Sequence, residues 1–110
     1  MRKTAILLFI LSFCATIAWG QDEDSSALFN SYCRTCHDAN GDGKTAASQR
    51  MSIPDLRSAE IQKLTDDDLF QRIGNGVKHK QYPHTFLKKG MTEVQVRELI
   101  GYIRTLKVKN

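Results

Sequence analysis

The stretch Cys33-Arg34-Thr35-Cys36-His37 constrains this chain more than any other part of its sequence. Its spacing, Cys-x-x-Cys-His, is the one at which a c-type haem is attached. Two thiols at this spacing can form thioethers with the two vinyl groups on one edge of a porphyrin, and the adjacent imidazole can bind the iron. The chain must then fold around the group that it carries. We therefore predict one covalent haem c, with Cys33 and Cys36 as thioether residues and His37 as the proximal iron ligand.

Two other interpretations of the same motif are a redox-active cysteine pair and half of a zinc site. A zinc site would need further cysteines or histidines at ligand spacing. A thioredoxin-like motif would need a βαβ pattern nearby. Neither pattern is visible in the sequence, so haem attachment is the interpretation that we retain.

Residues 1–20 have the pattern of a secretory signal peptide. The stretch begins with the basic pair Arg2 and Lys3, continues with an apolar run over 5–13, and ends in a small-x-small pattern at Gly20. The run is short for a transmembrane helix and no stop-transfer pattern follows it, which disfavours a retained membrane anchor. We predict cleavage after Gly20. The remaining residues, 21–110, are then expected to form one domain that is periplasmic or otherwise exported.

Removing 20 of the 110 residues leaves 90, enough for one small domain with a modest core. A haem would add a large apolar face to that core. Cleavage also removes Cys14, so the mature chain keeps only the two cysteines of the motif. These could pair in an oxidising compartment. Haem attachment also takes place outside the cytoplasm, so the export signal and the motif agree.

The net charge of +4 falls to +2 without Arg2 and Lys3. This modest charge excludes nucleic-acid binding driven by bulk electrostatics. Lysines cluster in the second half of the chain, at positions 78, 80, 88 and 89. Such a cluster is usually a solvated face, and it could also steer an acidic redox partner to the haem edge.

Four helices are predicted, each with a residue that can cap its N-terminus. They are 25–33 with Ser25 or Ser26 as the cap, 58–64 with Ser58, 66 to 74–76 with Thr65, and 93–106 with Thr92. Thr92 and Gln95 form a capping box, and apolar residues follow at helical spacing. The stretches 38–46, 53–56 and 77–90 are predicted as loops, and no alternating pattern typical of β-strands appears.

Taken together, the motif and the helices resemble a class I c-type cytochrome over nearly the whole mature chain. Phe29 and Tyr102 match the aromatic positions at which the first and last helices cross in that family. Residues 51–58 resemble the second-loop segment of small bacterial members, and 92–106 their closing helix. The resemblance implies an all-α cytochrome c fold of three to five helices around one covalently bound haem. It also implies one-electron transfer between a redox donor and an acceptor, not substrate turnover.

The sixth iron ligand is where the chain departs from this family. Most relatives supply it from a methionine that precedes a proline shortly before the last helix, whereas Tyr82 precedes Pro83 here. Counting back from the closing helix leads to His84, which we predict as the distal ligand. Counting forward from Gly76 leads instead to His79 or Lys80.

Two methionines are further candidates for that position. Met91 is the stronger alternative, although its place just before the last helix is typical of a core residue. Met51 is more remote and is expected to pack in the haem pocket. Imidazole ligation would give a lower reduction potential than methionine ligation.

The segment 38–43 matches the first half of a calcium-binding EF-hand loop. The twelfth position of such a loop requires a bidentate glutamate, and it holds Gln49 here. We interpret the segment as a turn, rich in glycine and Asx residues, through which the chain leaves the haem.

These patterns predict a monomeric monohaem cytochrome that carries single electrons between redox proteins outside the cytoplasmic membrane. Transient contact with membrane-bound respiratory complexes is part of this expectation. Two alternatives stay open: a haem-based sensor with an open or displaceable distal site, and an electron-relay subunit of a larger oxidoreductase. The sequence holds no independent catalytic constellation, such as a Ser/His/Asp set or a phosphate loop.

Overall fold

The computed structural model describes residues 24–79 and 84–107. Within them the chain forms six helices and no strand. The helices are α1 (Ser25–Tyr32), α2 (Arg34–His37), α3 (Ala46–Met51), α4 (Ala59–Gln62), α5 (Asp66–Gly74) and α6 (Glu93–Thr105). The prediction of an all-α fold is confirmed. The described part holds more than five helices because α2 and α4, each a single turn of four residues, count separately.

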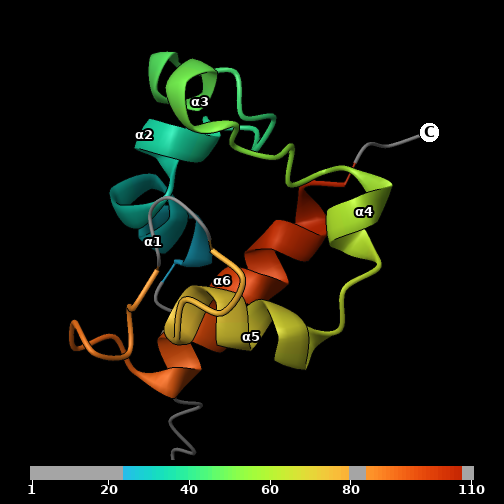
Figure 1. Ribbon diagram of the computed structural model, residues 1–110. Helices are drawn as coiled ribbons and strands as arrows, with labels where there is room; N and C mark the ends of the chain where they lie inside the picture. Colours follow the sequence, from blue (N-terminus) through green and yellow to red (C-terminus); the bar gives the residue numbers. More distant parts are fainter. Residues whose placement is uncertain (1–23, 80–83, 108–110) are drawn as a thin grey trace, which may run out of the picture.

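Helix α6 crosses α1 and lies beside α5, and these three helices enclose most of the core (Figure 1). At the crossing, the rings of Phe29 and Tyr102 lie 5.0 Å apart between centroids. Phe29 has no exposed surface, and neither do Val96 and Leu99 of α6. The sequence prediction that these two aromatic residues meet where the first and last helices cross is therefore confirmed.

The apolar periodicity of α6 explains why this helix occupies the centre. Its buried residues fall three and four apart on one face and are Val96, Leu99, Ile100 and Ile103. The predicted capping box is present: the Gln95 amide donates to the Thr92 hydroxyl and the Thr92 amide donates to the Gln95 side chain. Reciprocal bonds of this kind satisfy two donors that a helix end leaves unpaired.

Helix α1 begins at Ser25 as predicted, but its cap differs from the prediction. Asp24, not Ser25 or Ser26, is its cap, and one carboxylate oxygen accepts from both the amide and the hydroxyl of Ser26. A carboxylate is favoured over a hydroxyl here because it also interacts with the positive end of the helix dipole. The predicted caps Ser58 and Thr65 are both found.

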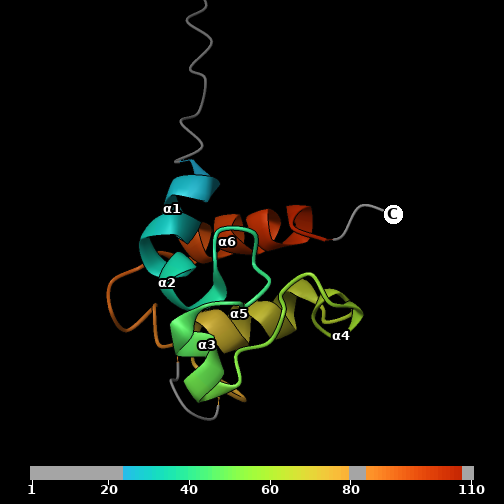
Figure 2. The same ribbon diagram turned by 90° about the horizontal axis from the view of Figure 1, so that it is seen from above.

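Helix α3 was not predicted. It has six residues and little apolar content, so its sequence lacks the periodicity by which helices are recognised. A reciprocal pair of side chains stabilises its start, because Thr45 caps the Ser48 amide and Ser48 caps that of Thr45. The Thr45 hydroxyl also donates to the carbonyl of Cys36 at 2.9 Å, which ties α3 to α2. Figure 1 shows these two helices together at the top of the view, and Figure 2 shows them on the side of the molecule opposite α4.

Arg104 of α6 holds the segment between α4 and α5. Its guanidinium donates to the carbonyls of Gln62 and Leu64 at 3.0 and 2.5 Å, and to the carboxylate of Asp66 at 2.8 and 3.1 Å. The Asp66 side chain is 66% exposed, so the ion pair itself adds less than about 1 kcal/mol. The two carbonyl bonds are better shielded, since the Arg104 side chain is only 28% exposed.

We therefore expect Arg104→Ala to lower the free energy of unfolding by about 2–3 kcal/mol, mainly through the lost charge-assisted bonds to carbonyls. Asp66→Asn should cost less than about 1 kcal/mol, because it removes only the exposed ion pair. Urea unfolding of the two variants measures both quantities. Equal losses in the two variants would mean that the ion pair, and not the carbonyl bonds, holds this segment.

Candidate functional site

The residues of the Cys-x-x-Cys-His motif lie at the turn from α1 into α2. The carbonyl of Cys33 accepts from the amides of Cys36 and His37, at 3.2 and 2.9 Å, which closes the single turn. Both thiols are free and partly buried, and the His37 side chain is buried with 7% of the residue exposed. The motif thus presents two thiols and one imidazole from one short, hydrogen-bonded turn.

The chain behind His37 turns sharply at Gly43. The Gly43 amide donates to the His37 carbonyl at 2.9 Å, and its backbone has a φ of +69°. A Cβ at this position would lie 3.0 Å from the carbonyl oxygen of Ile53 and 3.2 Å from that of Pro54. Glycine is required here for both reasons, because the left-handed backbone and the close approach each exclude a side chain.

In the segment 38–43, which we interpret as a turn, side-chain oxygens accept hydrogen bonds from nearby backbone amides. Asp38 accepts from the amide of Ala39, Asn40 from that of Asp42, and Asp42 from that of Lys44. These are Asx turns, which support the chain reversal. Over 24–79 and 84–107, no three His, Cys, Asp or Glu side chains gather in a way that could hold a metal ion.

A cavity of about 450 Å³ opens in front of the motif. This volume lies within the range of about 300–1,000 Å³ that is usual for cofactor sites. Its lining comes from every helix of the described chain and from the loops between them. The apolar lining residues are Phe29, Met51, Ile53, Pro54, Leu56, Ile61, Leu69, Ile73, Phe86, Leu99 and Ile103. Six of the ten residues of the core cluster therefore also form walls of the site.

His84 lies across this cavity from His37. The centroids of the two imidazole rings are 6.0 Å apart, and the ring planes differ by 29°. When two imidazoles bind one metal ion from opposite sides, two metal–nitrogen bonds of about 2 Å and two ring radii of about 1 Å separate the centroids by about 6 Å. The spacing of His37 and His84 matches this arrangement.

His79 is the third imidazole at the cavity. Its ring lies edge-on to that of His84, with the centroids 3.9 Å apart and the planes at 79°. On its other side, His84 lies against Phe86 at 5.4 Å, with the planes 21° apart, and Phe86 in turn contacts Tyr32 at 5.7 Å. His84 is therefore held between an aromatic ring and a second imidazole.

The structure gathers most of the predicted site residues around one cavity. Cys33, Cys36, His37, His79 and His84 all line it. Met51 also lines it, as expected of a pocket residue. By contrast, Met91 is not among the described residues around this cavity: it lines a separate groove of about 440 Å³ with Tyr32, Phe86 and Lys89.

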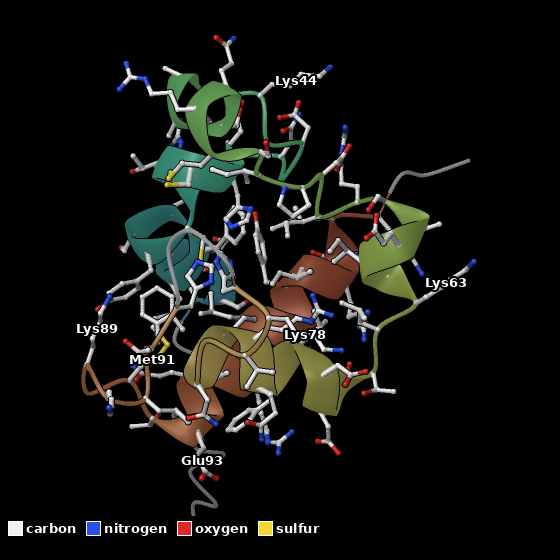
Figure 3. All side chains as sticks on the ribbon, viewed as in Figure 1. Lys44, Lys63, Lys78, Lys89, Met91 and Glu93 are labelled. Carbon is white, nitrogen blue, oxygen red and sulfur yellow. The ribbon has the colours of Figure 1, made fainter. Side chains whose placement is uncertain are left out.

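The labelled side chains show this separation. Met91 and Lys89 lie together at the edge of the molecule, whereas Lys78 lies in the middle of the view (Figure 3). Lys78 lines the main cavity, and the Lys89 ammonium lies 5.5 Å from the centre of the Phe86 ring. The predicted residues Lys80, Tyr82 and Pro83 fall outside the described part of the chain.

Two charged lining residues were not singled out from the sequence. Arg72, in the last turn of α5, and Glu60, in α4, both border the cavity. No pattern in the sequence links either residue to the motif, since each is brought there by the packing of its helix. Arg72 and Lys78 place positive charge, and Glu60 negative charge, beside a mostly apolar space.

Burial keeps the two facing histidines neutral. It is the main cause that lowers the pKa of His37 to about 4, followed by the charge of His79. The pKa of His84 falls to about 3, first through burial and then through the charges of His79, His37 and Lys89. Burial also raises the pKa of the Cys33 thiol to about 12, with a smaller contribution from Cys36. Neutral imidazole is the form that binds a metal.

The residues present fit a haem. Two thiols beside one ring, apolar walls and paired neutral imidazoles are the donor set that a c-type haem requires.

This helical fold, with its thiols and imidazole at the mouth of an apolar cavity, defines a class I c-type cytochrome. The chain belongs to the family described as cytochrome c oxidase, cbb3-type, subunit III, whose family model matches residues 20–103. It is also similar to a solved structure, the KustC0563 c-type cytochrome, with 26% sequence identity and a TM-score of 0.65 over 77% of this chain and 99% of that chain. No curated protein matches the chain.

Membership of this class indicates the general function of the chain. A c-type cytochrome domain transfers electrons through a covalently bound haem c, and it is by itself an electron carrier and not a catalytic enzyme. Cys33, Cys36 and His37 are the residues of this chain that fit the attachment motif.

Proposed function

We propose that this protein is an exported monohaem c-type cytochrome that carries single electrons between redox proteins, with His37 and His84 as its axial ligands. The observation that supports this most strongly is the pair of neutral imidazoles, His37 buried and His84 half-buried, with centroids 6.0 Å apart across the cavity. When bound, haem c supplies a one-electron redox couple.

The chain's own residues hold and tune that group. Cys33 and Cys36 anchor it on the α2 side of the cavity, and His84 approaches from the opposite side. The apolar walls exclude water, which favours the less charged state of the group and limits reaction with solvent. Arg72 and Lys78 supply positive charge at the lining that suits two propionates. A histidine in place of methionine on the distal side lowers the reduction potential.

Export rests on residues 1–20, which have the pattern of a signal peptide. None of the helices in the described chain has the length and hydropathy of a membrane span. A periplasmic or otherwise exported carrier would exchange electrons with a donor and an acceptor protein, among them membrane-bound respiratory complexes in transient contact. We propose that it acts as a monomer and binds no nucleic acid.

A second candidate is an electron-relay subunit of a larger oxidoreductase. The description of the matching family as a subunit of a cytochrome c oxidase favours this candidate. A third, a sensor with an open distal site, is disfavoured by the imidazole of His84 opposite His37. These candidates differ in what they bind: a relay subunit co-purifies with its enzyme, and an open-site sensor binds carbon monoxide at once when reduced.

The deciding experiment is the absorption spectrum of the exported, purified protein, oxidised and reduced, extended to the near infrared. We expect a low-spin spectrum without the charge-transfer band of methionine–iron ligation, and no fast carbon monoxide binding. The methionine band would contradict the assignment of His84. A high-spin spectrum would favour the sensor.

Acid is expected to release His84 only near pH 3. The neutral imidazole binds metal, and the pKa of His84 is lowered to about 3, so ligation is complete at pH 7 and persists to about pH 5. It is then lost as the pH falls further, because protonation favours the unbound side chain. A pH titration of the low-spin spectrum measures this change. A transition centred near pH 6.5 would mean that His84 is not buried.

A further inference from the structure

Three imidazoles meet in the cavity, although an iron held by His37 needs only one more. His79 and His84 both line the same space, and their ring centroids are 3.9 Å apart. This distance is smaller than the 6.0 Å between His84 and His37. A displacement of 3.9 Å would therefore bring the ring of His79 to the place that the ring of His84 occupies.

The imidazole ring of His84 is held less firmly than that of His37. A histidine that ligates a metal usually donates its other ring N–H to an acceptor, which fixes the orientation of the ring. The Nδ1 of His84 is buried and has no such partner among the described residues. The same atom of His37 also lacks one, but His37 is fixed by the α2 turn and by its neighbour Cys36. His84 lies in a loop, where its ring packs against the rings of His79 and Phe86.

The backbone before His79 differs from that around His84. His79 ends a turn in which its amide donates to the carbonyl of Gly76 at 3.3 Å, and Lys78 within that turn has a left-handed φ of +58°. A non-glycine residue in this conformation stores about 1 kcal/mol or more of strain. His79 therefore directly follows a strained backbone position.

From these contacts we infer that His79 and His84 are alternative ligands for one axial position: His84 occupies it, and His79 replaces it when His84 leaves. The inference rests on the proposed function, since it takes haem to be bound through His37. It adds that the distal site closes again without solvent or a small molecule entering. The haem iron would then stay six-coordinate when His84 dissociates, and the protein would still carry electrons.

Three variants test this with the spin state of the oxidised haem protein, read by absorption and electron paramagnetic resonance at neutral pH. His84→Ala should stay low-spin, because His79 takes its place, and His79→Ala should stay low-spin through His84. Only the double variant should be high-spin and bind carbon monoxide readily when reduced. Val94→Ala, at an exposed position of α6 outside the lining of the cavity, is the control and should leave the spectrum unchanged.

A high-spin His84→Ala protein would overturn the inference while leaving His84 as the proposed ligand. A low-spin double variant would overturn it as well, since another residue would then supply the ligand. If His84→Ala accumulates poorly, His84→Phe keeps the ring contact with Phe86, and the paramagnetic spectrum can be recorded on cell extracts. Failure of the proposed function is distinct: it would appear in the unmodified protein, as a methionine band or a high-spin spectrum.

Discussion

The double variant Cys33→Ala/Cys36→Ala is expected to lose all covalently attached haem. The thioethers are the bonds that survive denaturation, and the part of the chain that the structure describes contains no other cysteine. A haem stain of a denaturing gel, together with acid extraction, measures the attached fraction. Each single variant should retain part of it, because one thioether remains.

The same double variant should also be much less stable. A chain that folds without its haem must leave the apolar walls of the cavity of about 450 Å³ exposed to water, so it loses much of its hydrophobic stabilisation. Small domains have only about 5–15 kcal/mol of stability in total. We therefore expect the variant to lose most of its helical circular dichroism.

Cys14→Ser is the matched control for this experiment. If residues 1–20 are removed on export, the mature protein of this variant is identical to the unmodified one, and its haem content should be unchanged. Covalent haem in the double variant would contradict the attachment assignment. Loss of haem in Cys14→Ser would instead mean that residues 1–20 take part in the site.

The second large effect is expected for Phe29→Ala. Phe29 has no exposed surface, packs on Tyr102 at the crossing of α1 and α6, and lines the cavity. Truncating a fully buried phenylalanine costs about 3–5 kcal/mol, which is a large part of the stability of a domain of this size. Thermal unfolding of the haem-loaded variant should show a melting temperature lower by more than about 10 °C.

Val94→Ala provides the comparison on the same helix pair. Val94 lies on α6 but is 66% exposed, so its truncation should change the free energy of unfolding by no more than about 0.5 kcal/mol. Similar losses in the two variants would contradict the central role of the α1–α6 crossing. Because Phe29 also borders the haem site, its variant should in addition show a shifted reduction potential.

The parts of the fold that could be predicted are those decided by short-range interactions. Thr65 and Thr92 cap the helices that follow them through bonds to residues three positions away, which any chain with this local sequence can form. The apolar face of α6 could likewise be predicted, because its apolar residues recur at helical spacing. Helix α3 could not be found in this way, because six residues with little apolar content are held by capping and by a bond to α2.

The attachment of haem could be predicted from five consecutive residues, since the chemistry of two thiols and an imidazole depends on their spacing along the chain. The side chain that faces His37 across the cavity could not be predicted in this way. Two counts along the sequence pointed to different histidines, and a third candidate, Met91, lay nearby. The packing of the loops places His79 and His84 in the cavity with His37, and Met91 in another groove.

The sequence alone thus determined the covalent chemistry and the helical class, and its resemblance to class I c-type cytochromes predicted the crossing of the first and last helices. The first two depend on local spacing or on a periodic apolar face, which can be read from neighbouring residues. The tertiary structure decided which side chains face His37, because that depends on where a loop passes through space. The same packing brought Arg72 to the cavity, where no motif pointed to it.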